Sequence, residues 1–185
     1  LYHSLVHWVK SLDIKGFGQE LVDRLQEEGL VGEPADFYKL TVDEVAGLER
    51  MGTKSAEKVL KELNSKKELS IPTFIKALGI AQISEKTIEL LLPTHPSLDD
   101  ILKSKEEELA NIHGIGEITA KLLLEGLRVR KDIIKNLLEF ITLKKPKIVV
   151  GGKLQGQNFC FTGVRDKNLE VTIVELGGKI ASGVS

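Results

Sequence analysis

The chain has only one cysteine, Cys160, among 185 residues. An internal disulfide and a cysteine-rich metal site are therefore excluded, and a reducing, cytoplasmic setting is expected. An excess of one charge is also lacking, because 26 basic residues face 27 acidic ones and the net charge is −1. This balance excludes a globally basic, histone-like binder but leaves local contacts to phosphates open. No apolar run approaches the ~20 residues that span a bilayer, so no membrane partner is expected.

Catalytic motifs are lacking as well. The chain has no Gly-x-x-x-x-Gly-Lys-Ser/Thr phosphate loop and no Asp-Gly dipeptide, so the Lys-x-Asp-Gly motif of nucleotidyl transfer is missing. His3 and His7 have the spacing of a helical metal pair, but no third ligand lies nearby in the sequence, which favours a surface helix. Cys160 lies between two phenylalanines and is interpreted as a buried, inert thiol. We therefore expect a binding protein with no catalytic residue and no metal site.

A short turn element occurs four times at nearly constant spacing. Its clearest copy is Ile112-His113-Gly114-Ile115-Gly116, followed by an apolar helix. Recurrence on this scale predicts repeated two-helix units that bury their faces against one another. The last small residue of each copy serves as its anchor, and the anchors, 32 to 34 residues apart, are Gly18, Gly52, Ser84 and Gly116.

A small-residue turn at the start of a helix leaves backbone N–H groups exposed, and the helix dipole favours an anion there. Lys54 and Lys86 lie two residues after their anchors, where a cation is unfavourable unless an anion compensates for it. Packing of helices alone explains one such turn, but four in register favour phosphate binding. Gln82 and Ser84 leave a mainly structural third copy open, and His113 fits a DNA contact or a simple turn position. The predicted phosphate-binding residues are Gly16, Gly18, Arg50, Gly52, Thr53, Lys54, Ser84, Lys86, Gly114, Gly116, Ile118 and Thr119.

Helix starts can be read from capping residues. Thr41 and Glu44 have capping-box spacing, and Ser84 is expected to cap the helix that ends before Pro93. Ser97 and Ser104 are predicted to be successive N-caps, the second with Glu107 three residues later. A last helix is expected over residues 131–140. The sequence thus predicts a mainly α fold.

The composition changes near the end of the chain. We expect a compact helical domain over 1–143, built from repeat pairs at about 1–64 and 70–143, and a linker over 144–153. Residues 154–185 fit a strand, a helix over 168–176 and a second strand at 179–181, which predicts a parallel α/β element. About thirty residues cannot cover such a sheet, so this domain is expected to be incomplete. The turn at Thr162 and Gly163 fits either a phosphate site or a plain strand end.

The ordered set of turns resembles bacterial NAD-dependent DNA ligases. The matching segments are Asp13–Gly18, Pro34–Thr41, Leu48–Ala56, Ala77–Ile80 and Ile112–Gly116. Phe159–Gly163 with Gly177-Gly178-Lys179 is similar to the start of the BRCT domain that follows in this family. The resemblance implies a C-terminal fragment with four tandem helix-hairpin-helix motifs, followed by a truncated BRCT domain.

The resemblance also implies a function. In the family, the four hairpins grip nicked double-stranded DNA through its phosphates, without sequence specificity, and the enzyme seals nicks in replication and repair. The parent enzyme would transfer AMP from NAD to a lysine and then to the 5′-phosphate, with magnesium, and it would carry a zinc finger. No cofactor is expected in this fragment, which is expected to be a monomer and not catalytic alone.

Two other readings remain open. The chain could be the DNA-binding tail of another repair enzyme, such as a nuclease. Alternatively, it could be a non-catalytic adapter whose repeats only pack helices and whose turn at Thr162 and Gly163 recognises phosphorylated partners.

Overall fold

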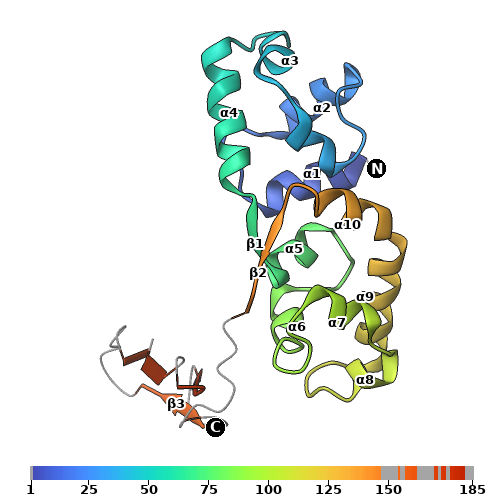
Figure 1. Ribbon diagram of the computed structural model, residues 1–185, viewed down its shortest axis with the longest axis vertical. Coiled ribbons are helices and arrows are strands. Elements are labelled where there is room, and N and C mark those ends of the chain that lie inside the picture. The colour runs from blue at the N-terminus through green and yellow to red at the C-terminus, as the bar shows by residue number, and fades with distance from the viewer. Residues whose placement is uncertain are drawn as a thin grey trace. The chain divides into compact units, whose positions relative to one another are not determined.

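The chain folds into two compact units, Leu1–Pro146 and Lys147–Ser185. The computed structural model describes residues 2–146, 154, 157–161, 169–170, 172–173 and 176–181. The first unit is mainly helical, as the sequence predicts (Figure 1). Its elements are α1 Tyr2–Ser11, α2 Gln19–Glu27, the 3-10 helix η1 Pro34–Lys39, α3 Val42–Ala46, α4 Thr53–Ser65, β1 Glu68–Ser70, α5 Ile71–Ala77, α6 Glu85–Glu89, α7 Leu98–Lys103, α8 Glu106–Ala110, α9 Glu117–Val129, α10 Lys131–Leu137 and β2 Thr142–Lys144.

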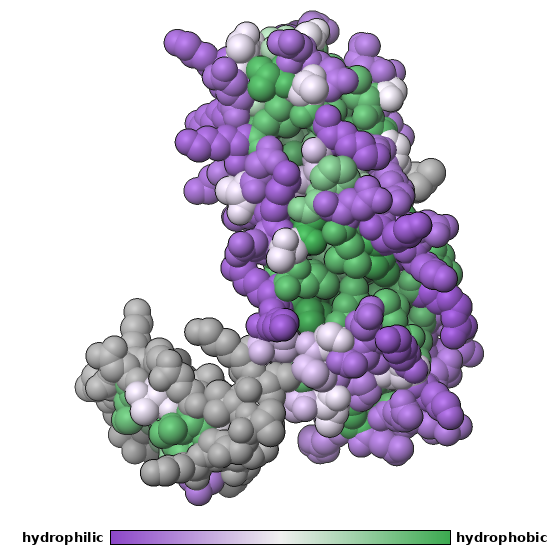
Figure 2. Space-filling view, in the orientation of Figure 1, coloured by the Kyte–Doolittle hydropathy of each residue, from purple (hydrophilic) through white to green (hydrophobic). Residues whose placement is uncertain are grey.

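The helices of the first unit form two groups in chain order. In Figure 1, α1 to α4 occupy one end and α5 to α9 the other, while α10 returns toward α1. Amphipathic helices bury one face each, and together they enclose a continuous apolar core. Trp8 and Tyr38 are buried with the apolar side chains, and among the described residues no charged side chain and no other polar one is buried. Hydrophilic residues line the edges of this unit on the face shown in Figure 2, and hydrophobic residues lie between them.

Two short strands connect the groups. β1 pairs with β2 in parallel, with Glu68 opposite Thr142 and Ser70 opposite Lys144. The Thr142 amide also donates to the Lys67 carbonyl over 2.8 Å. Strands of three residues leave too little alternation to be predicted from sequence. Lys144, which we expected at the start of the linker, is instead the last residue of β2.

Helix caps account for several helix starts. Thr41 and Glu44 form the predicted capping box, and the Ser97 side chain accepts from the Asp100 amide as expected of an N-cap. The prediction for Ser104 is wrong, because Lys105 is the N-cap of α8 and Ser104 closes α7. The Ser104 hydroxyl instead donates to the Asp100 carbonyl over 2.7 Å. The last helix is also shorter than predicted, since α10 ends at Leu137.

The 3-10 helix η1 carries three residues whose pKa values depart from the ordinary ones, Asp36, Tyr38 and Lys39. Burial raises the pKa of Tyr38 to about 12, against the opposing hydrogen bond from Trp8. Burial alone would also raise the pKa of Asp36. Hydrogen bonds from Lys39, Gly32 and Glu33 outweigh that effect and hold the pKa of Asp36 below its ordinary value. The Asp36 carboxylate accepts from the Gly32 and Glu33 amides over 2.9 and 3.0 Å and so tightens the turn into η1.

Helix α9 passes close to the loop after α5 at Gly126. A Cβ at this position would lie 2.5 Å from Cγ2 of Ile80 and 3.0 Å from its Cγ1. Replacing a helical glycine with alanine normally stabilises a helix by about 1 kcal/mol. Here the overlap with a buried, stiff side chain is larger, so Gly126→Ala is expected to lower the free energy of unfolding by about 1–3 kcal/mol.

Urea denaturation of Gly126→Ala, Ile80→Ala and the double variant measures this effect. Ile80→Ala removes the side-chain atoms that the new methyl group would overlap. In the double variant, the change Gly126→Ala should therefore be neutral or stabilising. If Gly126→Ala lowers the free energy of unfolding equally with Ile80 present and in the Ile80→Ala background, the proposed overlap is contradicted.

The second unit contains two strands within its described residues. β3 Asn158–Cys160 pairs in parallel with β4 Lys179–Ala181, and Asn158 lies opposite Lys179. Residues 169–170 and 172–173 between them are helical, which agrees with the predicted strand-helix-strand order. Cys160 is half-buried rather than buried. Thr162 and Gly163 lie outside the described residues.

In the part of the chain that the structure describes, no helix is both long and apolar enough to cross a membrane.

Candidate nucleic-acid interface

The four repeated turns have the same backbone conformation. Two residues before each anchor, the backbone φ is positive, at +80° for Gly16, +61° for Arg50, +63° for Gln82 and +89° for Gly114. The next residue donates its amide to the carbonyl three positions earlier over 2.9 to 3.3 Å in every copy. The left-handed conformation costs a non-glycine residue about 1–2 kcal/mol. Arg50 and Gln82 adopt it nevertheless, because the surrounding fold imposes the turn.

Each turn presents its backbone to solvent. The middle residue points into the core in three copies, as Phe17, Ile83 and Ile115, and Met51 is half-buried in the remaining copy. The residues on either side are exposed, including Gly16 and Gly18. The buried middle side chain therefore anchors the turn and leaves the start of the next helix open.

Three of the four helix starts have no side-chain cap. Gly18, Gly52 and Gly116 are the N-caps of α2, α4 and α9, and none provides a capping hydrogen bond. All three N-caps are extended, with ψ between 164° and 174°. These helix starts, of helices with nine or thirteen residues, are open in the sense that no N-cap side chain occupies their first N–H groups.

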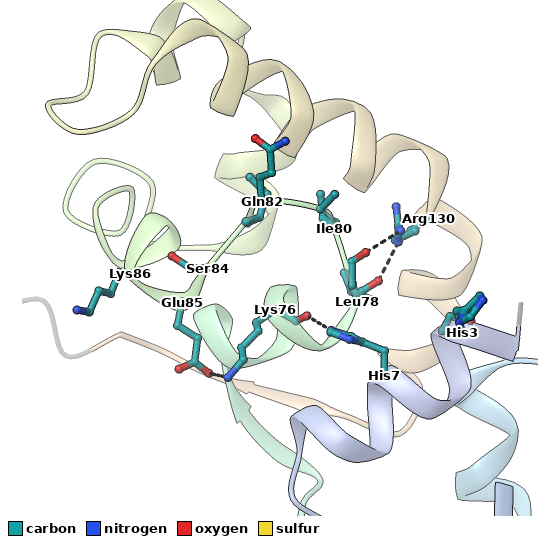
Figure 3. A pocket seen from close by; sticks show the side chains of 14 residues that line it. His3, His7, Lys76, Leu78, Ile80, Gln82, Ser84, Glu85, Lys86 and Arg130 are labelled. Carbon is teal, nitrogen blue, oxygen red and sulfur yellow. Dashed lines mark hydrogen bonds and ion pairs between the residues drawn. The ribbon is translucent and has the colours of Figure 1, made fainter. Parts of the chain in front are cut away.

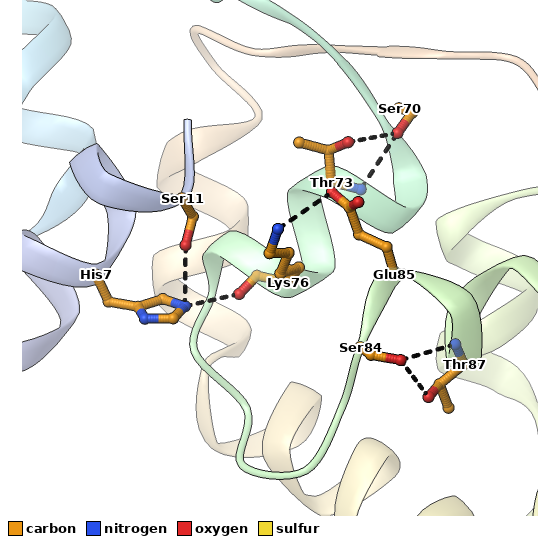
Figure 4. Close-up of polar contacts among 8 residues, drawn as sticks. All are labelled: His7, Ser11, Ser70, Thr73, Lys76, Ser84, Glu85 and Thr87. Atoms are coloured by element: carbon orange, nitrogen blue, oxygen red, sulfur yellow. Dashed lines mark hydrogen bonds and ion pairs between the residues drawn. The ribbon is translucent and has the colours of Figure 1, made fainter. Parts of the chain in front are cut away.

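The third turn differs in this respect. The Thr87 amide donates to the Ser84 hydroxyl over 3.2 Å, and the two hydroxyls lie 2.9 Å apart (Figure 4). The following helix α6 has only five residues. The same arrangement joins Ser70 and Thr73 at the start of α5. Ser84 thus satisfies its own helix, which supports the structural reading of copy three that the sequence left open.

Charge distinguishes the second turn from the others. The first turn of α4 contains no acidic residue, whereas Glu20, Glu85 and Glu117 occupy the first turns of α2, α6 and α9. Lys54 is exposed at the start of α4. Arg50 is exposed as well and pairs with Glu49 over 3.5 Å. The second turn is therefore the most favourable position for an anion on electrostatic grounds.

The first two turns lie side by side. They border a hollow of about 450 Å³ whose lining includes Gly16 and Gly18 from one turn and Met51 from the other. Gly16 also lies over α4, since a Cβ there would be 3.1 Å from Cγ2 of Val59. The last two copies pack similarly, because a Cβ on Gly114 would lie 2.9 Å from Cδ1 of Leu90. In each pair, one turn therefore packs against the helix that follows the other turn, or against the C-cap of that helix.

A larger hollow, of about 760 Å³, adjoins the third turn (Figure 3). Arg130 donates to the carbonyls of Leu78 and Gly79 over 2.9 and 3.0 Å. His7 is bound to the Lys76 carbonyl over 2.9 Å and to the Ser11 hydroxyl over 3.1 Å. These contacts hold the wall of the hollow together. They assign His7 a structural role, and in the described ranges no group of three or more potential metal-ligating residues occurs.

The remaining residues singled out from the sequence lie at the turns or at the helix starts that follow them. Ile118 has an exposed fraction of 74%, and Thr119 is partly exposed beside it at the start of α9. Lys86 and His113 are exposed at their turns. The sequence reading missed Arg24, which contacts the second turn from α2. Its only signal was the Glu20–Arg24 pair, one helical turn apart.

Two family models match the chain. A SAM-like helix-hairpin-helix tandem covers residues 12–65, which include the first two turns. A helix-hairpin-helix motif covers residues 73–131, which include the other two. Both matched stretches coincide with the paired turns described above.

The chain is also similar over its whole length to proteins named DNA ligase. That of Treponema denticola is 36% identical and that of Sorangium cellulosum 38% identical, each over 100% of this chain. That of Koribacter versatilis is 34% identical over the same extent. The chain spans about 30% of the length of these relatives. It is therefore related over its full length to the bacterial DNA ligases, fits their C-terminal region and carries helix-hairpin-helix motifs.

Proposed function

We propose that this chain binds double-stranded DNA through its phosphates as the C-terminal part of an NAD-dependent DNA ligase. The observation that carries the proposal is the set of like turns with open helix starts at Gly18, Gly52 and Gly116. Backbone N–H groups bind phosphate oxygens whatever the base sequence, so binding is expected to tolerate any sequence. With a net charge of −1, such local donors matter more than long-range attraction.

The finer architecture belongs to the same proposal. The four like turns count as four helix-hairpin-helix motifs arranged in two pairs. Parallel pairing of β3 with β4 supports a BRCT start in the second unit. The Thr162-Gly163 turn, candidate for phosphate recognition in that domain, stays a prediction. The names of the relatives favour a ligase over the tail of another repair enzyme or a non-catalytic adapter.

The parent enzyme would use NAD as adenylate donor, with magnesium, and would carry zinc elsewhere in its chain. It would seal nicks during replication and repair in the bacterial cytoplasm. This fragment would act as a monomer. It would bind the duplex around the nick and would not contribute catalytic residues.

Binding to a nicked duplex, measured by fluorescence anisotropy while salt is raised, tests the proposal. Each phosphate that an arginine or lysine neutralises should add about −0.9 to the slope of log affinity against log salt. The exposed Arg50 and Lys54 at the second turn therefore predict a slope of about −2 or steeper. An affinity that does not change with salt would contradict phosphate contacts, and equal affinity for intact duplex would remove the preference for a nick.

The third turn should contribute less than the other three. Ser84→Ala removes the N-cap of α6 and is expected to lower the free energy of unfolding by about 1 kcal/mol. Because the cap already satisfies the Thr87 amide, DNA affinity should change less than about twofold. Parallel urea denaturation and anisotropy separate the two effects. A large loss of affinity with unchanged stability would place Ser84 among the DNA contacts.

A further inference from the structure

Arg24 bridges the first and second turns. Its side chain extends from α2, where one guanidinium nitrogen donates to the Glu49 carbonyl just before the second turn. The other terminal nitrogen lies 3.6 Å from the Glu20 carboxylate, one helical turn back. The Arg24 side chain is only 29% exposed, whereas that of Glu20 is 91% exposed. Arg24 also lines the hollow between the two turns, together with Gly16 and Met51.

The same position makes the corresponding contact in the other pair of turns. Arg24 lies six residues after the anchor Gly18, and Leu90 lies six residues after the anchor Ser84. Leu90 touches the fourth turn, since a Cβ on Gly114 would lie 2.9 Å from its Cδ1. The first helix of each pair therefore reaches the neighbouring turn from an equivalent residue. One pair uses a guanidinium and the other uses an apolar side chain.

We propose that Arg24 is a positioning residue that fixes the spacing of the first and second turns, so that both meet phosphates of one duplex. This inference rests on the proposed function. Phosphates along DNA have a fixed repeat, so two rigid turns bind together only at the matching separation. A guanidinium donates several hydrogen bonds in fixed directions, which restricts the turn more narrowly than an apolar contact does. Arg24 thus acts through the turns and does not itself contact DNA.

The test compares Arg24→Leu, which installs the side chain found in the other pair, with Arg128→Leu on α9. Both variants remove one positive charge, but Arg128 is exposed far along α9 from the fourth turn. Arg24→Leu is expected to weaken binding of nicked duplex about fivefold, and Arg128→Leu less than about twofold. The weakening should persist in a Glu20→Gln background, because it comes from spacing and not from the exposed Glu20 charge. Arg24→Lys should restore part of the affinity.

A second measurement reports spacing without DNA. Spin labels at Gln19 and Thr53, in a Cys160→Ser background, give the distribution of distances between the two turns. Arg24→Leu should broaden this distribution of distances. The free energy of unfolding of Arg24→Leu should remain close to that of Arg128→Leu.

Each outcome has a distinct meaning. An unchanged distribution overturns the positioning role, and a broadened distribution with unchanged affinity overturns its part in DNA binding. If Arg24→Leu no longer weakens binding in the Glu20→Gln background, Arg24 serves only to neutralise the Glu20 charge. That result would also overturn the proposal. If the unaltered chain does not bind nicked duplex at all, the proposed function itself fails, and this inference with it.

Discussion

Replacing Lys54 with glutamate is expected to weaken binding of nicked duplex about 20-fold at roughly 100 mM salt. Among the helices that follow the four turns, only α4 has no acidic residue in its first turn; the change removes a cation there and adds an anion. A carboxylate near the open N–H groups of α4 competes with a phosphate for the same donors. The slope of log affinity against log salt should become shallower by about one. Anisotropy over a salt series measures both quantities.

Lys61→Glu is the matched control. Lys61 is exposed on the same helix, seven residues further along. At a rise of about 1.5 Å per residue it lies about 10 Å from Lys54, which exceeds the Debye length of about 8 Å at physiological salt. Both variants change the net charge by two, so general attraction falls equally. Lys61→Glu is expected to weaken binding less than about threefold.

Equal losses in the two variants would show that overall charge, and not the second turn, governs affinity. A loss that does not depend on salt would also contradict the proposed phosphate contact. In both cases the turn would keep only a role in helix packing.

Trp8→Ala is expected to lower the free energy of unfolding by about 3–5 kcal/mol. Trp8 is fully buried on α1. Its indole N–H donates to the Tyr38 hydroxyl over 3.2 Å, and its ring meets that of Phe74 edge-on, with centroids 5.9 Å apart. Trp8 therefore joins α1 to η1 and to α5, which belong to different groups of helices. Its loss leaves a cavity at that junction and an unpaired buried hydroxyl.

Urea denaturation followed by circular dichroism measures this effect. Val129→Ala is the control, because Val129 is 82% exposed and its change should stay within about 0.5 kcal/mol. Trp8→Phe should recover part of the stability, since it refills much of the cavity without restoring the hydrogen bond. A loss below about 1 kcal/mol for Trp8→Ala would show that the two helical groups do not depend on this contact.

The turns were predictable because their signals are local. A small anchor residue, an apolar residue before it and a small or apolar residue four positions later recur in every copy, as at Gly116, Ile115 and Ala120. The four like backbone conformations agree with that periodicity. The capping box at Thr41 and Glu44 was equally local and is confirmed. The prediction for Ser104 was wrong because its neighbour Lys105 is the N-cap of α8, and cap positions one residue apart look alike in sequence.

Contacts between distant segments could not be predicted in the same way. β1 and β2 are about seventy residues apart and carry three residues each, so neither has a pattern of its own. Arg24 reads as one half of a surface ion pair until the structure places the Glu49 carbonyl within its reach. The cap that Ser84 makes to Thr87 was expected of the helix start. Its consequence for phosphate binding follows only from comparison with the three uncapped turns.

By itself, the sequence determined how many times the turn recurs, which residue anchors each copy and which helix faces are apolar. These properties depend on neighbours within a few positions. The tertiary structure alone decided how the turns of each predicted pair meet, and that Arg24 and Leu90 make the contacts between them. Such features depend on how buried surfaces meet in space, and short-range patterns carry no record of that geometry.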